Sequence, residues 1–264
     1  MRLRLAGIVF CVLGIAACTE SSAPVSIPFE AAYAGAPIDC AEKANVRMTD
    51  LRFYVSNPRI RDGDGNWHEV ALDDDDAWQQ THLALIDLED GGGSCTNGTA
   101  DLYTTLSGTA RGRSWRGLEF TLGVPFEVNH GDPLAAEPPL GDAAMHWHWR
   151  GGYKFLRAGL RTADDGFWLH LGSTGCRGTI GNITYCDAPN RVTVRLDDFG
   201  PGDAVVVDLA ELVAGGALED RIAADCSSGP GEAHCPAAFR ALGLDHATGA
   251  ADGVQKLFRS RARP

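Results

Sequence analysis

The segment AMHWHWRGGYKFLRAGL, residues 144–160, places two tryptophans and two histidines in strict alternation before a Gly-Gly pair. Side chains of a β-strand point alternately to opposite faces, so a period of two predicts strands at residues 143–150 and 153–160. A strand that only fills a core uses Val, Ile and Leu, and a purely exposed strand uses Thr, Lys and Glu. The segment therefore predicts a β fold and marks one strand as a candidate site.

The same alternation recurs along the chain on both sides of this segment. It predicts further strands at residues 26–33, 46–60, 67–72, 102–109, 117–123, 166–171, 190–196 and 204–209. Sequences rich in Asp, Gly and Pro separate them, and helices are predicted only in the C-terminal third, at residues 209–213 and 236–242. We expect an all-β fold, an antiparallel β-sandwich or flattened barrel with a few short C-terminal helices.

The N-terminus predicts export. Arg2 and Arg4 precede an apolar run at residues 5–17 that is too short to span a membrane, and this run ends in Ile-Ala-Ala before Cys18. The pattern resembles a bacterial lipobox, in which cleavage leaves Cys18 as a lipidated first residue; an ordinary secretory signal peptide is the alternative. Thr19 at the second mature position favours the outer membrane of a Gram-negative bacterium, facing the periplasm. We expect a signal peptide at residues 1–17, a tether at 18–27 and one β domain at 28–264.

The net charge of the chain argues against some classes of binding partner. The chain has 35 acidic and 23 basic residues and a formal net charge of −12. Nucleic acids and anionic lipids attract basic proteins, so this acidic balance argues against nucleic acid as a partner and against adsorption on anionic lipid. We expect contact with the membrane through the lipid anchor.

Six cysteines remain once Cys11 and Cys18 are set aside, and six cysteines allow fifteen pairings. In an oxidising compartment they are expected to form structural disulfides rather than a metal–thiolate site. Spacing favours two local bridges that close short loops, and the third pair follows by elimination. The expected pairs are Cys176–Cys186, Cys226–Cys235 and Cys40–Cys95.

Motifs for catalysis are missing from the sequence. There is no GxSxG nucleophile elbow, no HExxH zinc motif and no phosphate-binding glycine loop, so we expect no enzymatic activity, and a hydrolase is the least favoured function. The sequence DGDGN at residues 62–66 opens like a calcium loop but lacks the bidentate Glu at the required offset, which favours a hairpin turn. The four aspartates at residues 73–76 are typical of a solvated loop.

Histidines and tryptophans form the candidate site. They are His130, His146, His148, His170, Trp147 and Trp149. A single histidine on a strand is most often a hydrogen-bonded polar residue, but several near strand ends, in an exported protein with paired cysteines, indicate copper or zinc. The two histidines and two tryptophans of residues 146–149 point to opposite faces of their strand, so only one of these pairs faces any single site.

Longer segments resemble the MbnP-like proteins, the metallo-mystery-pair four-Cys-motif family of bacterial copper handling. The resemblance covers nearly the whole mature chain and rests on several strings that occur in the same order. They are DLRFYVS (50–56), LIDLED (85–90), CTNGT (95–99), GLEFTLGVPF (117–126), NH (129–130), MHWHW (145–149), GYKF (152–155), HLGSTGC (170–176), PNRV (189–192) and the closing pair Cys226 and Cys235.

The resemblance implies a secreted or lipid-anchored β protein that binds copper and has no catalytic cycle of its own. It also implies a di-haem partner, an MbnH/MauG-like protein of the cytochrome c peroxidase family, which oxidises a tryptophan of the copper protein to kynurenine. Opening of the indole ring gives an aryl amine and a ketone, which can approach a metal where an indole cannot. Trp147 and Trp149 match the family's Trp-x-Trp strand and are the candidates for this modification.

The resemblance also suggests the copper ligands. His170 and His130 match histidine positions of the family and are the preferred ligands, with His146 third. His148 supplies an additional imidazole, which leaves open on which face of the strand a site forms. An alternative function is a surface β-sandwich lipoprotein that binds a glycan or a protein through the aromatic face of the two tryptophans.

Overall fold

The computed structural model describes residues 22–41, 45–112, 114–213 and 225–263 of the 264-residue chain. The expected signal peptide at residues 1–17 and the expected lipidation site at Cys18 lie outside these residues. Within the described ranges, no helix is both long and apolar enough to cross a membrane.

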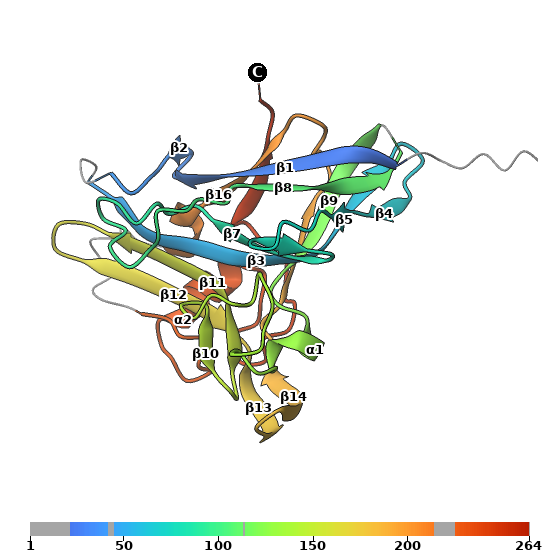
Figure 1. The fold of residues 1–264 in the computed structure, drawn as a ribbon. Helices are drawn as coiled ribbons and strands as arrows, with labels where there is room; N and C mark the ends of the chain where they lie inside the picture. The colour runs from blue at the N-terminus through green and yellow to red at the C-terminus, as the bar shows by residue number, and fades with distance from the viewer. Residues whose placement is uncertain (1–21, 42–44, 113, 214–224, 264) are drawn as a thin grey trace, which may run out of the picture.

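Two β-sheets pack against each other as a sandwich (Figure 1). The smaller sheet follows the order β17-β16-β1-β8-β5, with β2 beside β1. Its described strands are β1 (Ser22–Tyr33), β2 (Ala36–Pro37), β5 (Ala71–Leu72), β8 (Thr105–Arg111), β16 (Ala204–Asp208) and β17 (Phe258–Arg261).

The larger sheet is built around β3, which pairs with four other strands. Its described strands are β3 (Arg47–Asp62), β4 (Trp67–Glu69), β6 (Gln79–Gln80), β7 (Leu83–Asp87), β9 (Trp115–Leu122), β10 (His146–His148), β11 (Gly152–Arg161), β12 (Gly166–Gly172) and β15 (Val192–Leu196). A separate hairpin of β13 (Thr174–Thr179) and β14 (Asn182–Ala188) forms the narrow lower tip in Figure 1. The short helices are α1 (Phe126–Asn129), the 3₁₀ helix η1 (Leu209–Val213) and α2 (Cys235–Ala241).

Phenylalanines from both sheets join the layers. Phe29 of β1 and Phe258 of β17 face Phe53 of β3 and Phe120 of β9, with edge-to-face ring centroids 5.4–5.9 Å apart. All four side chains are buried. Each buried aromatic ring of this kind stabilises the sandwich by roughly 2–3 kcal/mol relative to an exposed ring.

The fold confirms the all-β prediction, and because the sheets do not close, the sandwich rather than the flattened barrel is present. The two predicted C-terminal helices match η1 and α2. Among the named strands the pairing is antiparallel, as predicted, except that β1 pairs with β16 in parallel. Parallel neighbours need a long connection, and here most of the chain separates the two strands.

The start of the domain also differs from the expectation. The predicted tether at residues 18–27 overlaps β1, because residues 22–27 already pair with β8. Among the described residues, the sheet therefore begins at Ser22.

All three predicted disulfides are present. They join Cys40 to Cys95, Cys176 to Cys186 and Cys226 to Cys235. The two local bridges follow from short sequence separations of 10 and 9 residues, and the third closes a separation of 55. Such bridges stabilise a fold mainly by restricting its unfolded chain.

The acidic motif at residues 62–66 forms the predicted hairpin turn, between β3 and β4. Asp62 uses its carboxylate inside the turn, accepting from the backbone N–H groups of Asp64 and Asn66 and contacting His68 Nε2 at 2.6 Å. The Asp62 carboxylate thus serves to close the turn.

Candidate metal site

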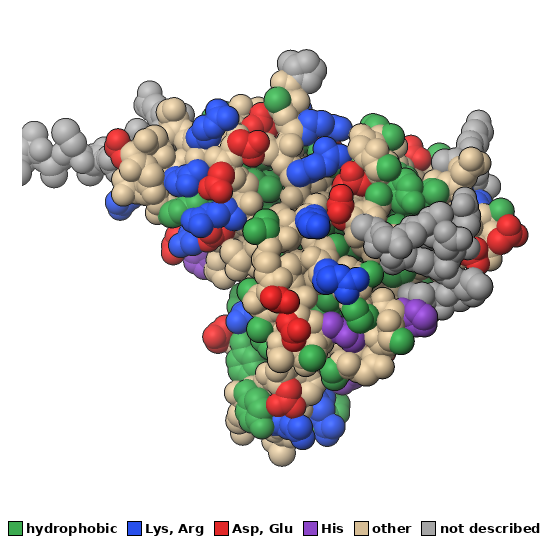
Figure 2. All heavy atoms as spheres, turned by 180° about the vertical axis from the view of Figure 1, so that it is seen from behind, with side chains coloured by type: hydrophobic (Ala, Val, Ile, Leu, Met, Phe, Trp, Pro, Cys, Tyr) green, Lys and Arg blue, Asp and Glu red, His purple; other side chains and the backbone are tan. Residues whose placement is uncertain are grey.

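The candidate residues lie on elements that meet near the narrow end of the molecule. This region combines β10, the end of β12, helix α1 and the β13–β14 hairpin (Figure 1). In the opposite view, several histidine side chains reach the surface close to this end (Figure 2).

His170 is fixed through its backbone on both sides. It lies on β12 opposite Arg157 of β11, and its N–H donates to the carbonyl oxygen of Cys226 at 2.8 Å. Its own carbonyl oxygen accepts from Ser228 Oγ at 2.8 Å. The Cys226–Cys235 disulfide closes the loop that contains both contacting residues, so it helps to hold His170 in place.

The imidazole of His170 is held in its neutral form. Its Nε2 is shielded from solvent and has no hydrogen-bond partner among the described residues. Burial is the largest cause that lowers the pKa of His170 to about 4, and the charges of the nearby Arg157 and Lys154 contribute in the same direction. The ring is therefore neutral at pH 7, which is the state that coordinates metals.

His130 follows helix α1, one helical turn that begins after Pro125. The helix ends at Asn129, a buried residue whose Oδ1 accepts from the backbone N–H of Tyr153 at 2.9 Å and whose Nδ2 donates to the carbonyl oxygen of Gly151 at 3.4 Å. Gly152 has φ +76°, and a Cβ there would lie 2.2 Å from the backbone oxygen of Asn129. A glycine at 152 is thus required for α1 to pack on the β10–β11 turn.

Asn129 also selects the tautomer of His130. Its amide Nδ2 lies 3.2 Å from His130 Nε2, and because an amide nitrogen only donates, Nε2 accepts and the ring proton lies on Nδ1. That Nδ1 is buried without a partner among the described residues. Burial lowers the pKa of His130, so the ring is neutral near pH 7 with its lone pair on Nε2.

His146 and His148 lie on β10 and differ in their suitability as ligands. His148 is exposed, and its Nδ1 accepts from the backbone N–H groups of Arg150 at 3.3 Å and Gly151 at 3.1 Å. In the tautomer that accepts these bonds the ring proton lies on Nε2, so neither nitrogen offers a free lone pair. His146 packs its ring 5.3 Å from that of Tyr153, and its pKa is lowered mainly by burial.

The two tryptophans have different neighbours. The ring of Trp147 lies over Gly172, where an added Cβ would come within 2.9 Å of it, and its centroid is 6.4 Å from that of His170 and 6.2 Å from that of His148. Trp149 instead stacks with the guanidinium of Arg150 at 4.8 Å. Trp147 is thus the candidate indole that contacts a preferred ligand.

The imidazoles alone do not form a closed cage. In the part of the chain that the structure describes, no group of three His, Cys, Asp or Glu ligand atoms within 4.8 Å of one another includes His146, His148 or His170. His130 belongs to one such group, but its companions are Cys176 and Cys186 in their disulfide. A metal held by the histidines would therefore need a further donor or a shift of side chains.

A cavity of about 430 Å³ opens beside Trp147 and His148. Hydroxyl groups and two arginines contribute to its wall, which includes Ser173, Thr174, Arg150 and Arg177. It gives solvent or a small ligand access to the face of Trp147.

Several residues that position the site were not predicted. Asn129, Ser228 and Arg157 are buried, and each acts on a histidine, Asn129 on His130 and the other two on His170. The sequence places Asn129 directly before His130, which was a usable signal. The other two residues lie 58 and 13 positions from His170, and only strand pairing brings them together.

Comparisons with known proteins identify a family and a similar fold. A family model described as MbnP matches residues 22–228. Among solved structures, "MbnP from Methylosinus trichosporium" is similar at 29% sequence identity with a TM-score of 0.80, covering 92% of this chain and 100% of that chain. No curated protein matches the chain.

Proposed function

This chain belongs to the MbnP family, and from that premise we propose that it is an exported copper-binding protein whose site is matured by oxidation of a tryptophan to kynurenine. One observation carries the proposal. The buried Nε2 of His170 has no partner among the described residues, its ring is neutral, and it lies beside Trp147. A desolvated nitrogen without a partner costs about 1–3 kcal/mol, which a bound cation would offset.

The donor set suits copper. Neutral imidazole nitrogen binds both oxidation states of copper, a soft or borderline cation that suits these donors. His170 offers Nε2 directly, and His130 offers Nε2 once the 3.2 Å contact from Asn129 is released. His146 is the third candidate, and His148 ranks last because both of its ring nitrogens are committed.

Oxidation of Trp147 would add the donor that the histidines lack. Two oxygen atoms from a peroxide-driven di-haem partner, an MbnH/MauG-like enzyme, add across the indole C2–C3 bond to give N-formylkynurenine. Water then releases formate and leaves kynurenine, with an aryl amine and a ketone next to His170. Trp147 ranks above Trp149 because it contacts His170, whereas Trp149 stacks on Arg150.

Co-expression with and without the partner tests the proposal. The protein made with its partner should show by intact mass the net loss of one carbon and gain of one oxygen, and should retain more copper after desalting. Trp147→Phe should abolish both effects, and the matched control Trp149→Phe should keep them. Equal copper content and mass in both preparations contradicts maturation, and unchanged binding in a His130→Asn, His170→Asn double variant contradicts the ligand choice.

The same proposal places the protein outside the cytoplasm without catalytic activity of its own. We propose cleavage before Cys18, lipidation of that residue and attachment to the outer membrane on the periplasmic side. Cys18→Ser should move the protein from the membrane fraction to the soluble periplasmic fraction. Retention of the variant in the membrane fraction would contradict the anchor.

The cavity beside Trp147 supports a second candidate function, binding of a glycan or protein segment. An indole face next to the hydroxyls of Ser173, Thr174 and Ser227 is a typical sugar-binding combination. If this function is correct, oligosaccharides raise the thermal midpoint and copper leaves it unchanged. The reverse result favours copper binding.

A further inference from the structure

Each disulfide has one further ligand-type side chain beside it. Within the described residues, three groups place such an atom and both sulfurs within 4.8 Å of one another. The groups are Cys40–Cys95 with Glu89, Cys226–Cys235 with Glu232, and Cys176–Cys186 with His130. Only the last combines sulfur with an imidazole, the pair of donors that soft cations prefer.

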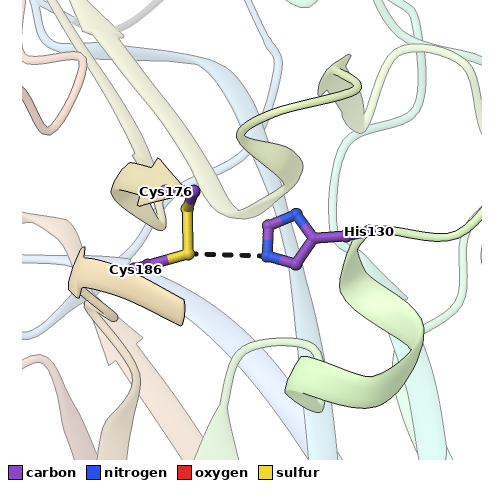
Figure 3. A group of neighbouring side chains, drawn as sticks. All are labelled: His130, Cys176 and Cys186. Carbon is purple, nitrogen blue, oxygen red and sulfur yellow. Dashed lines mark hydrogen bonds between the residues drawn. A yellow bond between two sulfur atoms is a disulfide. The ribbon is translucent and has the colours of Figure 1, made fainter. Parts of the chain in front are cut away.

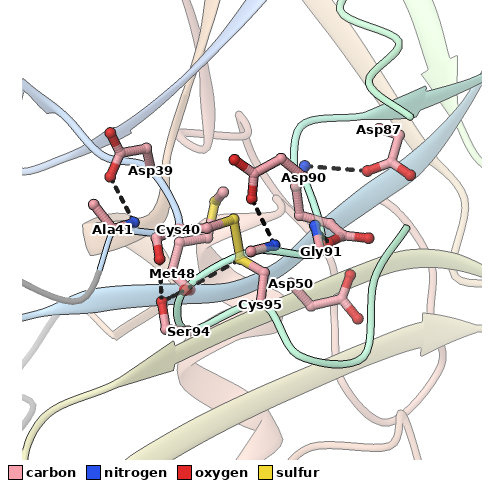
Figure 4. The surroundings of a disulfide bond; sticks show 12 residues. Asp39, Cys40, Ala41, Met48, Asp50, Asp87, Asp90, Gly91, Ser94 and Cys95 are labelled. Atoms are coloured by element: carbon pink, nitrogen blue, oxygen red, sulfur yellow. Dashed lines mark hydrogen bonds between the residues drawn. A yellow bond between two sulfur atoms is a disulfide. The ribbon is translucent and has the colours of Figure 1, made fainter. Parts of the chain in front are cut away.

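The two glutamates are already occupied. Glu89 accepts from the backbone N–H groups of Gly91 and Thr99, and Glu232 accepts from those of Ser227 and Gly229. The Cys40–Cys95 bridge is buried, and Figure 4 shows it among Ser94, Met48 and Asp50. These two disulfides therefore act as structural bridges.

His130 is oriented differently. Its Nε2 lies 3.5 Å from Cys186 Sγ, and the imidazole faces the disulfide (Figure 3). Because Asn129 Nδ2 donates to the same nitrogen, that nitrogen carries the lone pair of the neutral ring, and a cation could use it once this 3.2 Å contact is released. The β13–β14 hairpin holds Cys176 directly opposite Cys186, so both sulfurs would stay near His130 if the bond between them were broken.

Solvent access separates this disulfide from the other two. Cys186 is partly exposed, whereas the four cysteines of the other bridges are at most 4% exposed. Thiol–disulfide exchange requires that a reductant reach a sulfur atom. The Cys176–Cys186 bridge is thus the one that a dithiol would reach first in the folded protein.

We propose that His130, Cys176 and Cys186 form a redox-gated binding site for a soft cation, cuprous ion above all, which opens when this disulfide is reduced. A dithiol supplies two electrons and two protons: the protein S–S bond breaks, two S–H groups form, and the dithiol closes to its own disulfide. The cation then displaces the thiol protons and binds two sulfurs and Nε2. The site shares His130 with the proposed function but does not depend on tryptophan oxidation.

Selective reduction is the first arm of the test. The full-length protein, made without the di-haem partner, is titrated under native conditions with tris(2-carboxyethyl)phosphine, and the free thiols are alkylated and mapped by mass spectrometry. We expect Cys176 and Cys186 to be labelled at lower reductant concentration than the other four mature-domain cysteines. Labelling of another pair first overturns the proposal.

Cuprous ion binding is the second arm, measured by competition with bathocuproine disulfonate. The selectively reduced protein should bind Cu(I) at least tenfold more tightly than the oxidised protein and show near-ultraviolet thiolate-to-copper absorption. Cys176→Ser with Cys186→Ser should lose this gain, whereas the matched pair Cys40→Ser with Cys95→Ser should keep it. If the first double variant does not fold, alkylation of the selectively reduced wild type replaces it.

The outcomes separate this site from the proposed function. An increase in Cu(I) affinity that survives alkylation, or no increase on reduction, overturns the redox-gated site. Neither result bears on the site matured by tryptophan oxidation. His130→Asn should reduce the gain at least threefold, and an unchanged gain excludes the imidazole from the site. Partner-dependent copper retention in the oxidised protein, measured separately, decides the proposed function.

Discussion

His170 makes the stability of the metal-free protein depend on pH, and His170→Asn isolates that dependence. Burial, with the charges of Arg157 and Lys154, lowers the pKa of this imidazole from 6.5 to about 4. Below pH 6.5 the unfolded chain therefore binds a proton that the folded chain does not. The effect of His170 is therefore absent above pH 6.5, and it lowers the free energy of unfolding as the pH decreases towards about 4.

The size of the effect follows from the same shift. One pKa unit corresponds to about 1.4 kcal/mol, so the depression of the His170 pKa corresponds to about 3 kcal/mol when the pH reaches about 4. Because the ring is partly exposed, solvent screening reduces the expected loss to about 2–3 kcal/mol. Asp87, whose pKa burial raises to about 8, titrates with the opposite sign, but it is common to both proteins and cancels in their difference.

Urea denaturation followed by tryptophan fluorescence measures the effect. Wild type and His170→Asn are compared in the presence of a chelator at steps between pH 7.5 and 4.5. Above pH 6.5 the free energies of unfolding of the two proteins should differ by a constant amount. Below pH 6.5 that of wild type should fall more steeply than that of the variant, by up to about 1.4 kcal/mol per pH unit. Parallel profiles over the whole range would refute the argument that His170 is buried in its neutral form.

Three further predictions concern glycine substitutions, the loss of ion pairs and the effect of copper on stability. Gly152→Ala should lower the free energy of unfolding by about 3 kcal/mol or more, because φ is +76° and the added Cβ meets Asn129. The control Gly181→Ala has φ +70° but open space around the added Cβ, and it should cost only about 1 kcal/mol. Similar losses in the two variants would contradict the packing argument. Arg52→Met removes the guanidinium that pairs with the buried carboxylates of Asp50 and Glu89, and it should cost about 3–5 kcal/mol in the free energy of unfolding measured by denaturation. Arg177→Met removes an exposed pair and should cost far less, so an equally small loss at Arg52 contradicts its role. Free copper at about 100 times its dissociation constant should stabilise the matured protein by about 2.7 kcal/mol, reversed by chelation; an equal gain in His170→Asn excludes this ligand.

Local patterns allowed much of the fold to be predicted from sequence. Period-2 alternation identified the main strands, because side-chain direction in a strand depends only on neighbouring residues. Cys176 and Cys186, like Cys226 and Cys235, are close enough along the chain to indicate their pairing, and the third bridge followed by elimination. The predicted turn at residues 62–66 has the same local origin, because Asp62 bonds to residues within its own loop.

The β13–β14 hairpin is a local feature that the pattern missed. Its residues 174–188 are rich in Gly and Thr, and their burial does not alternate cleanly, so hydrophobic periodicity gives no signal there. Helix α1 was missed for a related reason, because one turn of four residues is too short to show a helical period.

The candidate site was decided only by tertiary structure. The sequence determined that imidazoles and indoles alternate on one strand and recur on others, but not which of them meet. Strand pairing placed Arg157 opposite His170, packing of α1 brought Asn129 onto the β10–β11 turn, and the close approach of Gly172 brought Trp147 rather than Trp149 to His170. These contacts join residues far apart in the chain, and their energies depend on burial, which a local pattern does not specify.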